Sequence, residues 1–93
     1  MATQLYWREH RTGQRLYLRQ ENGEEVEVGG VRRTPRGFDA LAKTMTYDPG
    51  RAKKDFATIH EAKLFVESFR PWELFYYSDH KLKVELDVRP LGD

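Results

Sequence analysis

Three short segments near the start of the chain alternate strictly between apolar and polar residues. A β-strand sends successive side chains to opposite faces, so each segment predicts a strand with one buried face. Short stretches rich in turn residues separate the segments, which predicts consecutive hairpins. The apolar positions are Leu5, Trp7, Leu16, Leu18, Val26 and Val28.

The turn sequences indicate the register of each hairpin. A two-residue turn at Asn22-Gly23 would place Leu18 opposite Glu27 and mix the two faces. A three-residue loop at 21–23 keeps the faces apart and puts Gly23 where a left-handed residue is expected, so we prefer it. In the first hairpin, 10–13 forms the loop. The predicted pairs are Leu5–Leu18, Trp7–Leu16, Leu16–Val28 and Leu18–Val26.

These registers place two like charges directly opposite each other on the outer face of the sheet. Arg8 opposes Arg15, and Tyr6 lies beside Tyr17. Opposed like charges repel each other unless an anion or an acidic side chain lies between them. This pair is therefore the strongest indication of a binding function in the first half of the chain.

Charge is arranged in blocks, although the net charge of the 93-residue chain is only +1. Basic blocks with tyrosines among them are typical of nucleic-acid contacts, because arginines bind phosphates and tyrosines stack on bases. Cross-strand ion pairing is the commoner origin of such blocks. Two of the blocks, at 32–36 and 51–54, are expected in loops. The candidate nucleic-acid or anion contacts are Tyr6, Arg8, Arg15, Tyr17, Arg32, Arg33, Arg36, Arg51, Lys53 and Lys54.

The segment 38–45 matches two periods. Phe38 and Leu41 begin a helical spacing, whereas Phe38, Ala40 and Ala42 alternate as in a strand. We predict a short helix over 38–45, with a strand as the alternative.

The clearest helix signal lies at 59–69. Thr58 and Glu61 form a capping box, in which the two side chains satisfy free amides at the helix start. At about 100° per residue the apolar residues share one face, and Pro71 ends the helix. Leu64 falls on the opposite, polar face. The apolar positions are Ile59, Ala62, Phe65, Val66 and Phe69.

The segment DFATIHEAKLFVESF, residues 55–69, resembles the strand-to-helix step in the small arm-site DNA-binding domains of tyrosine recombinases. Phe56, Thr58, Glu61 and Ala62 carry the resemblance. It implies a three-stranded sheet that reads DNA and a helix packed behind that sheet. The chain departs from this family in a further hairpin at its C-terminal end.

That hairpin is predicted between the aromatic run 72–77 and the alternating segment 82–88. A three-residue loop at 79–81 buries Trp72, Leu74 and Tyr76 against Val88, Leu86 and Val84. A four-residue loop starting at Ser78 buries the other set instead. We prefer the first register because burying a tryptophan and a leucine removes more apolar area from water. It leaves Phe75 and Tyr77 outside. The candidate contacts for a protein partner are Leu64, Phe75 and Tyr77.

No motif indicates catalysis. The histidines His10, His60 and His80 lie on different expected elements without metal-ligand spacing, and Gly29-Gly30 lacks the Lys-Ser/Thr step of a phosphate loop. No cysteine is present, and no apolar run approaches the length of a membrane span. We therefore expect no metal, no cofactor, no membrane contact and a cytoplasmic location.

The expected architecture is one α+β domain over residues 1–93. It consists of a mainly antiparallel sheet of about five strands, formed by an N-terminal three-stranded meander and the C-terminal hairpin, with the 59–69 helix on one face. The expected function is a non-enzymatic binding module. Nucleic acid is the leading ligand, and a protein partner, including a second copy of the chain, is the alternative.

Overall fold

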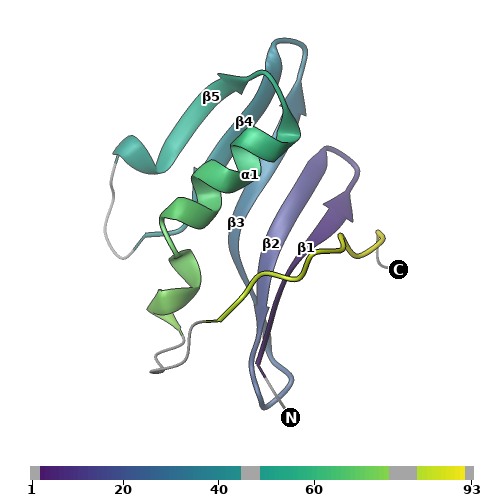
Figure 1. The fold of residues 1–93 in the computed structure, drawn as a ribbon, viewed down its shortest axis with the longest axis vertical. Coiled ribbons are helices and arrows are strands. Elements are labelled where there is room, and N and C mark those ends of the chain that lie inside the picture. The colour runs from purple at the N-terminus through teal and green to yellow at the C-terminus, as the bar shows by residue number, and fades with distance from the viewer. Residues whose placement is uncertain (1–2, 45–48, 76–81, 92–93) are drawn as a thin grey trace.

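The computed structural model describes residues 3–44, 49–75 and 82–91. Its elements are β1 (Gln4–His10), β2 (Gly13–Arg19), β3 (Glu25–Thr34), β4 (Gly37–Ala42), η1 (Pro49–Arg51), β5 (Ala52–Phe56), α1 (Ile59–Ser68) and η2 (Pro71–Leu74), where η marks a 3₁₀ turn. Within the described residues, the five strands form one antiparallel sheet in the order β1-β2-β3-β4-β5, and α1 packs across one face (Figure 1). The expected α+β class and five-stranded antiparallel sheet are confirmed.

The first two hairpins have the predicted registers from β1 to the start of β3, but the first loop is 11–12 and not 10–13, because His10 pairs with Gly13. β1 and β2 pair in the expected register, with Leu5 opposite Leu18, and Leu18 in turn pairs with Val26. The loop between β2 and β3 is 21–23, and Gly23 has a φ of 88°. Glycine adopts this left-handed conformation without steric cost, which is why the alternating pattern can continue directly after the turn.

A β-bulge in β3 makes the predicted Leu16–Val28 pair wrong. Leu16 instead pairs with Gly29, and Val28 is the extra residue of β3. A bulge of this kind changes the phase of a strand. As a result Val28 and Val31 are both buried in the core although they are three positions apart, and Gly30 lies on the opposite face.

The predicted helix at 38–45 is wrong. Most of this segment forms β4, which pairs antiparallel with β3. Ala40 and Ala42 are buried, whereas Leu41 between them is 48% exposed. Burial therefore follows a period of two, because pairing with β3 turns alternate residues toward α1. Met45, the end of the predicted helix, lies outside the described residues.

Strand β5 contains basic residues that the sequence places in a loop. Lys53 and Lys54 lie on β5, and Arg51 ends η1 directly before it. β5 pairs antiparallel with β4, with Phe56 opposite Phe38. Because β5 is the edge strand and most of its residues are exposed, it lacks the apolar alternation that identifies a half-buried strand.

Helix α1 begins at the predicted cap. The Thr58 hydroxyl accepts a hydrogen bond from the Glu61 backbone N–H at 3.2 Å. Ala62 and Val66 are fully buried, and Leu64 on the far side is 50% exposed. The predicted division of the helix into an apolar and a polar face is therefore confirmed.

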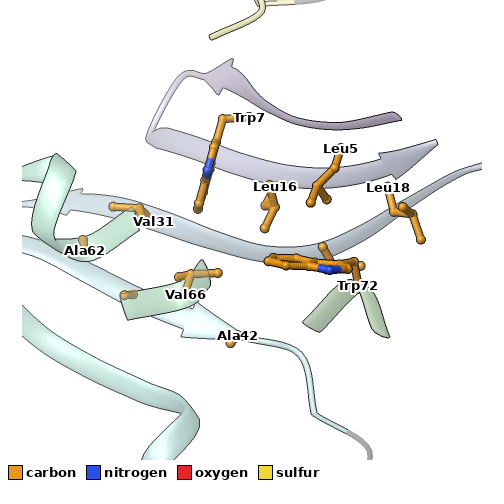
Figure 2. Close-up of a cluster of buried hydrophobic side chains, with 11 residues drawn as sticks. Leu5, Trp7, Leu16, Leu18, Val31, Ala42, Ala62, Val66 and Trp72 are labelled. Atoms are coloured by element: carbon orange, nitrogen blue, oxygen red, sulfur yellow. The ribbon is translucent and has the colours of Figure 1, made fainter. Parts of the chain in front are cut away.

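The core lies between α1, η2 and one face of the sheet (Figure 2). Trp7 is almost fully buried, and its indole Nε1 donates a hydrogen bond to Glu67 Oε2 at 2.9 Å. This bond connects β1 to α1 across the core. The buried cluster comprises Leu5, Trp7, Leu16, Leu18, Val28, Val31, Ala40, Ala42, Ala62, Val66 and Trp72.

The predicted strand at 72–77 is wrong in its described part. Residues 71–74 form η2, and Pro71 at its first position favours such a turn because its φ is fixed and it lacks an N–H. Trp72 is buried as expected, but it reaches the core from this turn. Phe75 is 39% exposed, as expected, although the hairpin on which that expectation was based is absent from the described residues. Tyr76 and Tyr77 lie outside the described residues.

Residues 82–91 pair with β1 and not with the aromatic run, so the predicted C-terminal hairpin is wrong. The backbone N–H groups of Glu85 and Arg89 donate to carbonyl oxygens of β1 at 2.8 and 2.9 Å. The β-bridge between Arg8 and Arg89 is parallel. Val84 packs against the core, but Leu86, expected on the buried face, is fully exposed. The segment thus covers the edge of β1, which would otherwise present unpaired backbone groups.

We predict that Gly29→Ala destabilises the fold. A β-carbon at Gly29 would lie 2.5 Å from Val66 Cγ1 and 3.1 Å from the Leu41 carbonyl oxygen, so α1 would have to move away from the sheet. Overpacking of this kind costs about 1–3 kcal/mol. Urea denaturation measures the change in the free energy of unfolding.

Gly30→Ala is the matched control. A β-carbon at Gly30 would meet only the Gln14 carbonyl oxygen at 3.5 Å and Arg15 Cγ at 3.6 Å, which are ordinary contacts. Its free energy of unfolding should stay within about 1 kcal/mol of the parent value. An equal loss of stability in both variants would contradict the close approach of α1 to the sheet.

Candidate functional site

The pairing registers show which side chains lie on the face of the sheet opposite α1. Directly opposite residues of neighbouring strands share a face. One row crosses all five strands through Arg8, Arg15, Gly30, Leu41 and Ala52. We call this side the open face; besides the row it contains Tyr6, His10, Tyr17, Glu25, Glu27, Arg32, Asp39 and Lys54.

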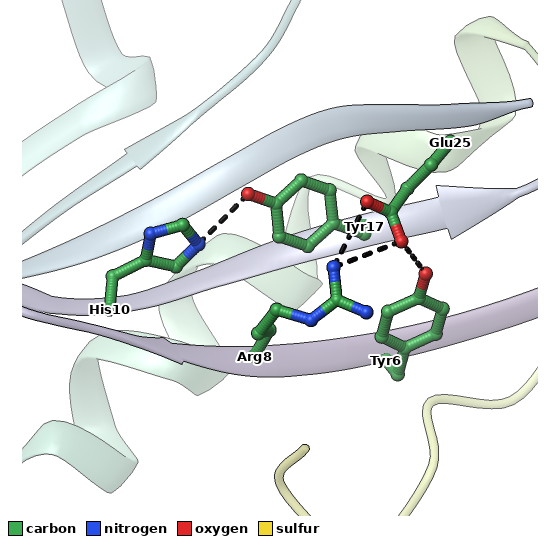
Figure 3. Close-up of polar contacts among 5 residues, drawn as sticks. All are labelled: Tyr6, Arg8, His10, Tyr17 and Glu25. Carbon is green, nitrogen blue, oxygen red and sulfur yellow. Dashed lines mark hydrogen bonds and ion pairs between the residues drawn. The ribbon is translucent and has the colours of Figure 1, made fainter. Parts of the chain in front are cut away.

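At the β1–β2 end of the open face, five side chains form a connected polar cluster (Figure 3). The Tyr6 hydroxyl donates a hydrogen bond to the Glu25 carboxylate, and Arg8 Nη1 lies 3.0 Å from Glu25 Oε1. The Arg8 guanidinium is 5.3 Å from the ring centroids of both Tyr6 and Tyr17. His10 Nε2 lies 2.9 Å from the Tyr17 hydroxyl. The cluster therefore holds the Arg8 guanidinium between two aromatic rings and one carboxylate.

The predicted opposition of Arg8 and Arg15 is present, but acidic side chains of this chain neutralise it. Arg8 pairs with Glu25, and Arg15 Nε lies 3.2 Å from Glu27 Oε1. Both acids come from β3, one strand beyond Arg15. The pair of like charges consequently needs no external anion, and it no longer points to a ligand.

Tyr6 is not available as a stacking surface, contrary to expectation. Its side chain is fully buried, and the Arg89 guanidinium covers its ring at 3.6 Å from the centroid. Burial, together with the hydrogen bond to Glu25, raises the pKa of Tyr6. Tyr17 is partly exposed, so it is the candidate tyrosine that a ligand can reach.

The cluster also shifts the protonation of Glu25 and His10. Burial acts to raise the pKa of Glu25, but the hydrogen bonds from Tyr6 and Arg8 and the charge of Arg8 together outweigh it and lower that pKa. Burial, followed by the charge of Arg15, lowers the pKa of His10. At neutral pH Glu25 is therefore ionised and His10 is uncharged.

A concavity of about 590 Å³ lies in the open face over β2 to β5. Gly30, Leu41 and Ala52 of the central row form an apolar floor, and Gly30 leaves space because it has no side chain. The volume falls in the range of small-molecule sites. Among the described residues that line it, five are basic and two are acidic: Arg15, Arg32, Lys43, Arg51 and Lys54 against Glu27 and Asp39.

Both acidic residues of the concavity have partners within the chain. Glu27 pairs with Arg15 at 3.2 Å, and Asp39 Oδ1 accepts a hydrogen bond from the Asp55 backbone N–H at 3.3 Å. The rim therefore carries an excess of positive charge in a chain whose overall net charge is +1. Such an excess attracts anions to this region of the surface.

The structure separates basic candidates that are neighbours in the sequence. Arg32 and Lys54 line the concavity, together with Arg51. Arg33 and Lys53, adjacent on the same two strands, are paired with residues that face α1 and so lie on the other side of the sheet. Arg36 lies in the turn between β3 and β4 and does not line the concavity.

The candidate contacts for a protein partner lie on different elements. Leu64 is in the middle of α1. Phe75 caps η2, and Lys43 Nζ lies 5.0 Å from its ring centroid. Tyr77 falls outside the part of the chain that the structure describes.

Sequence reasoning missed the floor of the concavity. Gly30, Leu41 and Ala52 come together only through the pairing of β3, β4 and β5. A strand at β4 was only the alternative to a helix, and β5 was expected to be a loop. The Gly29-Gly30 pair is the one signal in the sequence that could have indicated a gap on a sheet face.

Comparisons with family models, with curated proteins and with solved structures find no match for this chain. The strand-to-helix step implied by the resemblance to arm-site domains is present, because Phe56 ends β5 and α1 begins at Ile59. Among the described residues, no group of three or more histidine, cysteine, aspartate or glutamate side chains could hold a metal ion. No helix in the described ranges is long and apolar enough to cross a membrane.

We predict that Glu25→Gln removes a pH-dependent part of the stability. The folded pKa of Glu25 is below its ordinary value of 4.5, so its stabilising effect is complete above that pH and is lost as the pH falls through the lowered pKa. At pH 7 the variant should be less stable by about 1 kcal/mol. The difference should shrink toward zero in acid, as urea denaturation at a series of pH values would measure.

Glu27→Gln is the control for this experiment, because the Arg15–Glu27 pair is nearly half exposed. It should lose no more than about 0.5 kcal/mol at pH 7. A stability difference between Glu25→Gln and the parent that stays constant from neutral to acid pH would contradict the role assigned to the Glu25 carboxylate.

Proposed function

We propose that this chain is a small, non-enzymatic nucleic-acid-binding module that contacts phosphates with the open face of its sheet. The observation that supports this most is the concavity, where five basic and two acidic residues line the described surface around an apolar floor. Phosphate binding by lysine and arginine supplies most of the affinity in non-specific nucleic-acid complexes. The open face offers such side chains on a rigid sheet.

The arrangement of charge favours an extended polyanion over a single small anion. Arg32 and Lys54 lie on β3 and β5, on strands separated by β4. Both are exposed, and they line the same concavity. Arg15 is held by Glu27, so we assign the main phosphate contacts to Arg32 and Lys54. Tyr17 at the other end of the open face is partly exposed and can add an aromatic contact.

We predict that Arg32→Ala and Lys54→Ala each weaken binding to an oligonucleotide and reduce its salt dependence. Each lost phosphate contact should lower the slope of log K against log salt concentration by about 1. Fluorescence anisotropy with a labelled strand, at several salt concentrations, measures this slope.

Arg33→Ala and Lys53→Ala are matched controls, since each removes the same charge from the neighbouring residue of the same strand on the α1 side. They should leave the slope nearly unchanged. Equal effects of all four substitutions would mean that only net charge matters. Absence of any oligonucleotide binding by the parent protein at low salt would refute the proposed nucleic-acid-binding function.

A protein partner on the outer side of α1 is the second candidate, favoured by Leu64. A leucine that is 50% exposed on the polar face of a helix gains nothing from the fold itself. Under this alternative, Leu64→Glu should abolish a pull-down interaction or change the oligomeric state while the melting temperature stays the same. Ser68→Glu, at another exposed position of α1, controls for added charge. A large loss of stability in Leu64→Glu would show that Leu64 belongs to the core.

A further inference from the structure

The concavity combines a basic rim, which phosphate binding needs, with an apolar floor, which phosphate binding does not need. Its floor is apolar, since Gly30 has no side chain, Ala52 is small and Leu41 exposes 48% of its surface. Its rim carries the basic residues Arg32 and Lys54. A single exposed leucine is common on protein surfaces, but Leu41 lies beside the gap at Gly30 and inside the basic rim, so the three features form one site.

We propose that this concavity holds one unpaired nucleobase, so that the module selects single-stranded over double-stranded nucleic acid. The inference rests on the proposed function, because Arg32 and Lys54 must bind the flanking phosphates. A base is flat and largely apolar on its faces, and it can lie over Gly30 against Leu41, which separates Gly30 from Ala52 in the row. In a duplex the bases are stacked inside and cannot reach this floor.

The hydrogen-bonding groups of the concavity fit the edge of a base. Glu27 and Asp39 line it, and their carboxylates are acceptors for the exocyclic amino groups of adenine and cytosine. Each carboxylate keeps accepting capacity beyond the contact with Arg15 or Asp55. The concavity thus offers an apolar surface for the face of a base, acceptors for its edge and cations for the adjoining phosphates.

Gly30→Leu tests the inference, because a leucine side chain would occupy the space above the floor. A β-carbon at Gly30 makes only ordinary contacts, at 3.5 and 3.6 Å. Gly30 is also not one of the glycines with a positive φ. The variant should therefore fold. Leu41→Ser, at an exposed position, is a second variant that removes apolar floor without adding volume.

The probes are strands of about twelve nucleotides of alternating adenine and cytosine, as DNA and as RNA, a duplex of the same length, and an abasic strand with the same number of phosphates. The parent protein should bind the base-carrying strands about five- to tenfold more tightly than the abasic strand or the duplex. Gly30→Leu and Leu41→Ser should lower affinity for the base-carrying strands to the abasic level. Affinity for the abasic strand should not change.

Two results would overturn the inference and leave the proposed function intact: equal affinity of the parent for abasic and base-carrying strands, or equal loss of affinity for both in Gly30→Leu and Leu41→Ser. Failure of the parent to bind even the base-carrying strands at low salt would refute the proposed function itself. Circular dichroism and melting temperature confirm that each variant is folded before its affinity is compared. Comparison of the affinities for the DNA and RNA strands shows whether the module prefers deoxyribose or ribose.

Discussion

Helix α1 lies so close to the sheet that a β-carbon at Gly29 would stand 2.5 Å from Val66 Cγ1. This close approach lets one short helix cover the apolar face of the strands, together with Trp72 from η2, the turn that follows the helix. The core of a small domain is limited by the area that it can remove from water. Because most of the apolar burial is on the α1 side, the opposite side is dominated by polar and charged contacts.

The bulge in β3 connects this core to the candidate site. Neighbouring residues of a strand lie on opposite faces, and the bulge at Val28 sets Gly29 toward α1 and Gly30 on the open face. Gly29 makes room for the helix, and Gly30 leaves the gap that becomes the floor of the concavity. Without the bulge, alternation from Val26 would turn Gly30 toward α1 and Gly29 to the open face.

Local patterns were sufficient to predict the parts of the fold that depend on neighbours in the chain. The register of β1, β2 and the start of β3 follows from alternation and turn chemistry, and the start of α1 follows from the Thr58–Glu61 capping box. β4 was misassigned because its apolar residues fit both a helical and a strand period. β5 was missed because an exposed edge strand has no apolar alternation.

Long-range pairing explains what the sequence could not predict about the site. The opposition of Arg8 and Arg15 was predicted, but its neutralisation by Glu25 and Glu27 requires side chains that reach across strands. The parallel pairing of 82–91 with β1 places Arg89 over a tyrosine expected to be exposed. Neither contact leaves a periodic signal, since both join segments that are far apart in the chain.

Two-dimensional ¹H–¹⁵N NMR can show whether nucleic acid binds the open face. A single-stranded oligonucleotide should be titrated into the labelled protein while backbone amide shifts are followed. We expect the largest changes at Gly30, Arg32, Leu41 and Lys54, with little change along the exposed side of α1. Changes concentrated around Leu64, or spread evenly over all basic residues, would contradict binding at the open face.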